Sequence, residues 1–89
     1  MGDLAAVLDD YLALRRSVGL SVVHLSNDLP KFVSFLESEG AETITTDLAL
    51  RWAGQRRKPG KRLGAVRVFA RYVQAIDPRT EVPPADLLS

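Results

Sequence analysis

The sequence predicts an all-α protein, built as one bundle of four helices. Four segments carry apolar residues in helical patterns, and each of them ends at a glycine or at the Asp77–Pro78 pair. Apolar residues make up 46% of the 89 residues, which is enough for one modest core and leaves no room for a separate cofactor domain. A single four-helix domain, followed by a proline-rich tail, is therefore expected.

The first helix has the clearest pattern. Asp3 is its expected N-cap, and Gly19 is expected just past its C-terminal end. Its apolar residues fall at i, i+3, i+4, i+7, i+10 and i+14, and they are Leu4, Val7, Leu8, Tyr11, Leu14 and Val18. This stripe is expected to face the core, with Asp9, Asp10 and Arg16 on the other side.

The second helix closes at Gly40, but two starts are possible. A start near Ser21 gives a helix of about 18 residues with Pro30 inside it, which costs about 3 kcal/mol or forces a bend. Alternatively, Asn27 or Asp28 caps a shorter helix that holds Pro30 in its first turn, where no donor is lost. We favour the longer helix with a bend at Pro30. Its apolar residues are Leu25, Leu29, Phe32, Val33, Phe35 and Leu36.

The third helix is short and follows a β-branched stretch. Ile44 is expected to enter the core, and Thr45 or Thr46 to cap the helix, with Asp47 near its positive end. Trp52 is expected to be buried because of its size. The helix should stop by Gly54, and a connector of residues 55–60 follows.

The fourth helix is expected from about Lys61 to Ile76, where Asp77–Pro78 ends it. Gly64, Arg67, Arg71 and Gln74 share the face opposite the apolar residues, whereas Arg62 points toward the buried side and is expected to cap or pair within the domain. The expected buried residues are Leu63, Val66, Phe69, Ala70, Val73 and Ile76. Residues 79–89 are expected to form an extended linker with a short apolar end.

The charge of the chain is strongly polarised although the net charge is only +1. Residues 51–79 carry nine basic side chains and one acid, Asp77, whereas residues 1–50 carry three basic and eight acidic side chains. A basic segment on an amphipathic helix is the electrostatic footprint of a protein that binds a polyanion, usually nucleic acid. The alternative is a solvated helix face that only keeps the protein soluble.

Several classes of function are disfavoured by composition. Cysteine is absent and His24 is the only histidine, so the sequence offers neither a thiolate or histidine-cluster metal site nor a recognisable catalytic triad, and no cofactor is expected. The acidic, amphipathic N-terminus does not resemble a signal peptide, and no apolar run reaches the length of a membrane span. We therefore expect a cytoplasmic protein without membrane or small-molecule partners.

The order of short motifs along the chain resembles a known family. The motifs are Tyr11-Leu12 with Arg15-Arg16 and Gly19, Phe32-Val33-Ser34-Phe35-Leu36-Glu37, Ile44 through Ala53, Arg62-Leu63, and Val66-Arg67-x-Phe69-Ala70-Arg71-Tyr72 before Asp77-Pro78. In this order and spacing they resemble the N-terminal core-binding (SAM-like) domain of tyrosine recombinases, the phage-integrase family. Two departures are a short, very basic connector before the fourth helix and the lack of an upstream tyrosine in the second.

The resemblance implies a SAM-like orthogonal bundle over residues 1–78 and an interdomain linker over residues 79–89. The catalytic residues of the family are two arginines, a lysine, histidines and a tyrosine nucleophile, and all lie C-terminal to this region. None of that sequence is present, so no residue here inherits a catalytic role, and the chain itself is not expected to be an enzyme.

In the relatives, the second and fourth helices of this domain face the major groove of DNA. The resemblance therefore implies DNA contacts from the fourth helix and the connector, namely Lys61, Gly64, Arg67, Arg71, Gln74, Arg56, Arg57 and Lys58. The second helix would add His24, Asn27 and Lys31, although for His24 we favour an ordinary, partly exposed histidine over a DNA contact. Arginine can bind guanine and glutamine can bind adenine, whereas a basic connector suits phosphate contacts.

The expected function is thus double-stranded DNA binding, as the N-terminal arm of a site-specific tyrosine recombinase acting in DNA integration and recombination. The alternative is a helical protein–protein interaction module that contacts other recombinase subunits or another partner. In that case the acids Asp9 and Asp10 would meet the basic surface of a neighbour.

Overall fold

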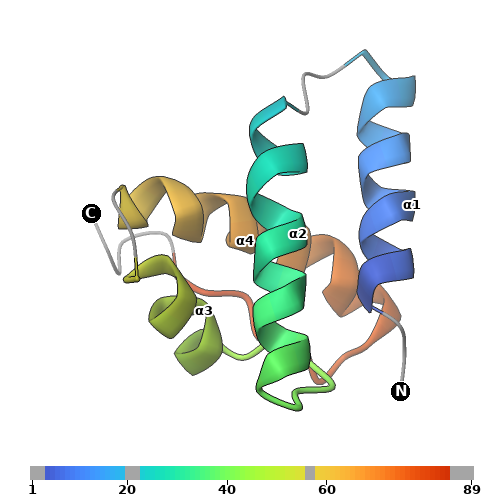
Figure 1. The fold of residues 1–89 in the computed structure, drawn as a ribbon. Helices are drawn as coiled ribbons and strands as arrows, with labels where there is room; N and C mark the ends of the chain where they lie inside the picture. Colours follow the sequence, from blue (N-terminus) through green and yellow to red (C-terminus); the bar gives the residue numbers. More distant parts are fainter. Residues whose placement is uncertain (1–3, 20–22, 56–57, 85–89) are drawn as a thin grey trace.

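The structure is a computed structural model that describes residues 4–19, 23–55 and 58–84, with the side chains of Val23 and His24 excepted. Within these ranges the chain forms four helices and no strand: α1 (Leu4–Ser17), α2 (Val23–Ser38), α3 (Thr46–Ala53) and α4 (Pro59–Ile76). Figure 1 shows α1 and α2 side by side and antiparallel, with α4 crossing behind α2 and α3 packed below the N-terminal half of α4. The predicted all-α, four-helix fold is confirmed.

One core joins all four helices. Phe32, Leu29 and Leu36 of α2 and Phe69 of α4 are fully buried, together with Ile44 from the stretch before α3. Aromatic contacts connect the helices, because the ring of Tyr11 in α1 lies 5.6 Å from that of Phe69. The core predicted from helical periodicity is therefore largely correct for α2, α3 and α4.

The predicted core stripe of α1 is wrong in its C-terminal half. Leu14 and Val18 are 51% and 63% exposed, whereas Leu12, which was not in the stripe, is buried. The cause is the position of the neighbouring helix: α4 meets α1 at Tyr11, whose ring lies 5.1 Å from that of Tyr72. The last turn of α1 extends beyond this contact. Asp3, the predicted N-cap, lies outside the described residues.

Helix α2 runs continuously through Pro30, which is its eighth residue. The longer of the two predicted helices is therefore the correct one, although Ser21 itself lies outside the described residues. At its C-terminal end Gly40 adopts φ +69°, a conformation that glycine reaches without strain. The Gly40 N–H donates to the carbonyl of Glu37, and the Ala41 N–H donates to that of Leu36. These two bonds form a Schellman motif that closes the helix.

Helix α3 begins as predicted. The hydroxyl of Thr45 accepts a hydrogen bond of 3.2 Å from the Leu48 N–H, which satisfies one of the donors left open at the helix start. Trp52 is 3% exposed, and Gly54 closes the helix through a bond from its N–H to the Leu50 carbonyl. An eight-residue helix depends on such packing for its stability.

Helix α4 begins at Pro59, two residues before the predicted start, with proline at the position where its missing N–H costs least. Lys58 precedes it in the left-handed conformation, at φ 57°. Arg62 is buried, as predicted, but Ile76 is 55% exposed, so its assignment to the core is wrong. Ile76 lies in the last turn, where the chain leaves the helix through Asp77.

The tail is extended, as predicted, but residues 79–84 pack against the domain. Thr80 and Pro83 are almost completely buried. The Glu81 N–H donates to the Ile44 carbonyl at 2.9 Å, and the Glu81 carboxylate accepts a bond of 2.8 Å from the Thr46 N–H, at the first residue of α3. Figure 1 shows this segment returning from the end of α4 toward α3. The described part of the tail thus ties the end of α4 to the start of α3.

The burial of Phe69 leads to a stability prediction. Replacement of Phe69 by Ala should destabilise the fold by about 3–5 kcal/mol, a large part of the stability expected for a small domain. Arg71→Ala is the matched control, because Arg71 is exposed on the same helix and should change stability little. Thermal denaturation followed by circular dichroism measures both. Equal melting temperatures would contradict the observed packing of α4.

The packing of the tail leads to a second prediction. A chain shortened to end at Pro78 should melt at a lower temperature than the 89-residue chain, because it loses the buried Thr80 and Pro83 and the carboxylate that caps α3. Pro84→Ala, which alters an exposed residue of the same segment, should leave the melting temperature unchanged. If the shortened chain melts at the same temperature as the full chain, the tail does not stabilise the folded unit.

Candidate nucleic-acid interface

The ten basic residues of the described chain differ in their partners. Arg51 and Arg79 are neutralised within the domain. Arg51 contacts Glu39 at 3.0 Å and Asp47 at 3.3 Å, and Arg79 contacts Asp77 at 2.9 Å. These side chains are occupied by acids and are poorly placed to bind a second anion.

Arg15 and Arg16 of α1 donate to the hydroxyls of Tyr11 and Ser26, and Arg62 stacks on Trp52. Five further basic side chains remain. Among the residues that the structure describes, no acid pairs with any of them: Lys31, Lys58, Lys61, Arg67 and Arg71. Four of the five belong to α4 or its N-cap, and Lys31 belongs to α2. These five lie on or beside the two helices that the resemblance assigned to DNA, whereas Arg15 and Arg16 lie on α1.

The outer face of α4 carries Gly64, Arg67, Arg71 and Gln74. Arg71 and Gln74 are exposed and Arg67 is half-buried. A Cβ added at Gly64 would meet no atom within 4 Å, so the backbone is openly accessible there. The Gln74 amide nitrogen donates to the Thr80 carbonyl at 3.1 Å, so this side chain holds the tail as well as facing outward.

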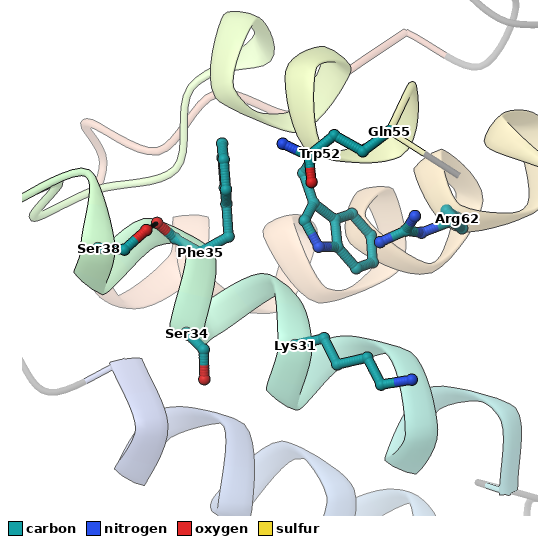
Figure 2. Close-up of a pocket in the computed structure, with 7 residues that line it drawn as sticks. All are labelled: Lys31, Ser34, Phe35, Ser38, Trp52, Gln55 and Arg62. Carbon is teal, nitrogen blue, oxygen red and sulfur yellow. Dashed lines mark hydrogen bonds between the residues drawn. The ribbon is translucent and has the colours of Figure 1, made fainter.

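The exposed face of α2 carries Asn27, Lys31, Ser34 and Ser38, which follow at i, i+4, i+7 and i+11. Three of them border a cavity of about 260 Å³ between α2, α3 and α4. The cavity is lined by Lys31, Ser34, Phe35, Ser38, Trp52, Gln55 and Arg62. Figure 2 shows that α2 supplies one wall, and that Trp52 of α3, Gln55 just after α3 and Arg62 of α4 supply the others.

Arg62 and Trp52 form the floor of this cavity. The guanidinium carbon of Arg62 lies 3.8 Å from the centroid of the Trp52 ring, and the two residues are 7% and 3% exposed. A guanidinium keeps its charge when it stacks on an aromatic face, and the ring offsets part of the cost of burial. The rim residues Lys31, Ser34 and Ser38 are exposed.

The cavity was not predicted from the sequence. Arg62 was assigned to the buried side of α4 and Trp52 to the core, and both assignments are correct. The stack between the two could not be inferred, because they belong to different helices joined by a connector of unknown path. The available signal was a basic residue, Arg62, among the apolar residues of the fourth helix, in a chain with a single tryptophan in the helix before it.

The predicted DNA-binding residues therefore do not all lie on one surface. At about 100° per residue, Arg67 and Arg71 lie about 140° and about 180° around α4 from Arg62. They leave the helix on a different side from the cavity, which Lys31 borders. Lys61 is exposed in the first turn of α4, which follows the N-cap Lys58, and lies between the outer face of α4 and the cavity.

Three of the predicted contacts cannot be placed. Arg56 and Arg57 lie outside the described residues, and so does the side chain of His24, whose backbone belongs to the first turn of α2. Asn27 is exposed on α2, as a contact residue requires. Lys58 is exposed, and its left-handed backbone is unusual for a residue with a side chain.

A compact turn fixes the chain after α4. The Asp77 carboxylate accepts bonds from both the side chain and the backbone N–H of Arg79, at 2.9–3.1 Å. The hydrogen bond from the Arg79 side chain is the main reason why the pKa of the Asp77 carboxyl lies below its usual value. The hydrogen bond from the Arg79 backbone N–H lowers this pKa further. This turn directs the tail back toward α3.

Two further features bear on the class of function. Within the described residues, no group of three or more histidine, cysteine, aspartate or glutamate side chains is arranged to hold a metal ion. None of the helices in the same ranges has the length and apolar character needed to cross a membrane.

Comparison with known proteins gives one relevant match. The chain is similar to a protein of Sinorhizobium fredii (strain NBRC 101917 / NGR234) named "Putative integrase/recombinase y4rB", with 42% identity over 93 residues. The match covers 99% of this chain and 30% of the relative, so the chain spans about a third of that protein's length. This similarity supports the integrase/recombinase family. No protein-family model matches the chain, and no solved structure matches it.

Proposed function

We propose that this chain binds double-stranded DNA as the N-terminal, core-binding arm of a site-specific tyrosine recombinase. The observation that carries the proposal is the group of five basic side chains on α2, α4 and the α4 N-cap that no described acid neutralises. Cations of this kind bind phosphates and release the counterions of the duplex. The similarity to an integrase/recombinase names the kind of protein in which such a surface would act.

In this function the domain holds and orients the duplex, and strand cleavage belongs to a separate catalytic domain. Residues 79–84 would begin the connection to that domain. An α-helix fits the major groove, so α4 is the element best suited to enter it, with Arg67 and Arg71 directed at base edges or phosphates. The accessible backbone at Gly64 permits a close approach on the same face.

A double substitution on α4 tests this function. Arg67→Gln combined with Arg71→Gln should lower the affinity for a labelled duplex and reduce the salt dependence, by about 0.9 in log–log slope for each lost phosphate contact. The fold should persist, because neither side chain belongs to the buried arc. Fluorescence anisotropy at several salt concentrations measures affinity and slope together.

The matched control removes the same charge elsewhere. Arg16→Gln combined with Arg51→Gln alters two exposed arginines on α1 and α3, one of which already pairs with acids. We expect a clearly smaller loss of affinity from this pair. An equal loss from both pairs would mean that only net charge matters, and no binding by the unaltered chain would refute the DNA-binding function.

A second candidate function, contact with another subunit, is favoured by one observation. Leu14, in the last turn of α1, and Val18, just after the helix, are 51% and 63% exposed, and Asp10 lies one turn before Leu14 on the same side of the helix. Exposed apolar side chains that cluster in this way mark contact surfaces more often than isolated ones.

Self-association tests this second function. If a second copy covers Leu14 and Val18, Leu14→Glu should shift the sedimentation of concentrated protein toward the monomer, because a carboxylate would be buried without a partner. Ala13→Glu, which adds the same charge at the adjacent exposed position, should have little effect. Monomeric behaviour of the unaltered chain at all concentrations would exclude self-association through α1.

A further inference from the structure

We propose that the cavity between α2, α3 and α4 is a phosphate-binding site that receives one phosphodiester group of the DNA backbone. The proposal rests on the proposed DNA-binding function and assigns part of it to a specific site. It differs from the sequence-based expectation, in which the outer face of α4 and the connector supplied most contacts, and it adds Arg62, Ser34 and Gln55.

The lining has the chemistry that a phosphodiester requires. Lys31 and Arg62 supply two positive charges, Ser34 supplies a hydroxyl donor, and Gln55 supplies an amide, whereas the Ser38 hydroxyl already donates to the Phe35 carbonyl at 2.7 Å. None of the seven described residues that line the cavity is acidic, so no carboxylate repels an anion from within. Charged donors to phosphate oxygens form the stronger class of hydrogen bonds.

Lys31 is available to bind an anion. Its side chain is exposed, and among the described residues no hydrogen bond or ion pair engages its ammonium group. Figure 2 shows the Lys31 side chain extending along the cavity so that its amino group ends on the same side as the Arg62 guanidinium. Two cations that approach one opening from different helices define a point of high positive potential.

Arg62 contributes differently from Lys31. It lies on the floor, 7% exposed and stacked on Trp52, so its charge acts from a site that water reaches poorly. An electrostatic attraction is stronger in such surroundings than at an open surface. We therefore assign to Arg62 the role of fixing the positive potential of the cavity, and to Lys31 and Ser34 the direct contacts at the rim.

The position of the cavity suits a duplex that α4 approaches. A helix in the major groove has a phosphodiester strand along each side of it, since the groove is only about 12 Å wide. The cavity opens on the side of α4 that faces α2. Because Arg62 lies on nearly the opposite side of α4 from Arg67 and Arg71, the strand on that side would reach the cavity over its exposed rim on α2, at Lys31.

Trp52 makes this site directly observable. It is the only tryptophan in the chain and lies in the cavity wall, so its fluorescence and its indole N–H resonance report on the cavity alone. The intact chain is titrated with a short duplex and, separately, with inorganic phosphate. We expect both to shift the Trp52 resonance, with inorganic phosphate acting only at much higher concentration.

Variants at the rim provide the decisive comparison. Lys31→Gln should weaken the Trp52 response several-fold and reduce the salt slope for duplex binding by about 0.9, with an unchanged melting temperature, because Lys31 is exposed. Lys31→Arg should restore the response. Arg71→Gln, outside the cavity, should leave the Trp52 shift at saturation intact even where it lowers affinity.

The possible failures are distinguishable. If the duplex binds by anisotropy but Trp52 does not respond and Lys31→Gln has no effect on the salt slope, the cavity is not a phosphate site and the DNA-binding function stands. If inorganic phosphate shifts Trp52 in a Lys31-dependent way while no duplex binds, the cavity is an anion site and its assignment to DNA is wrong. If neither ligand shifts Trp52, the phosphate site is refuted.

Discussion

The stack of Phe32, Trp52 and Arg62 is the contact on which the arrangement of three helices depends. The ring centroids of Phe32 and Trp52 lie 5.1 Å apart in a tilted arrangement, and the guanidinium carbon of Arg62 lies 3.8 Å from the centroid of the Trp52 ring. Because α3 has only eight residues, it cannot persist as an isolated helix, and the burial of Trp52 is what fixes it against α2 and α4. Once α3 is fixed, its N-terminal end offers the donor that the tail carboxylate accepts, and its C-terminal end forms a wall of the cavity.

Helical periodicity predicts which side of a helix is apolar, but it does not predict how far along the helix a neighbour extends. The pattern was therefore reliable in the middle of α2 and α4, where helices cross, and misleading at the ends. Leu14, Val18 and Ile76 continue an apolar stripe beyond the point where another element covers it. Each lies in or just after the last turns of its helix, past the contact of Tyr11 with Tyr72 or at the exit toward the tail.

The position of the tail, residues 79–84, could not be predicted from the sequence for a different reason. Proline-rich composition correctly excluded a fifth regular element from residues 79–84, and nothing local indicated where the extended chain would lie. That position is set by Glu81, which bonds to Ile44 and Thr46 across 35 and more residues of sequence. Hydrogen bonds between residues so far apart in the sequence depend on the tertiary fold, so no pattern of neighbouring residues predicts them. Local signals did predict the Thr45 cap and the glycine at the end of α2, because both depend on a few consecutive residues.

For the charged residues, too, the fold provides information that the sequence does not. The sequence shows an excess of basic residues between Arg51 and Arg79, but it does not distinguish those that are neutralised from those that are available. In the fold, the two ends of that segment, Arg51 and Arg79, pair with acids supplied largely by the acidic first half of the chain. The middle of the segment keeps its charge, and Lys31 joins it from α2. Pairing with acids thus neutralises both ends of the basic segment and leaves the charges of Lys58, Lys61, Arg67 and Arg71 on α4 and its N-cap, and that of Lys31 at the mouth of the cavity. A polyanion would meet the domain there, and the same packing of Trp52 that holds α3 in place also shapes the floor of the cavity.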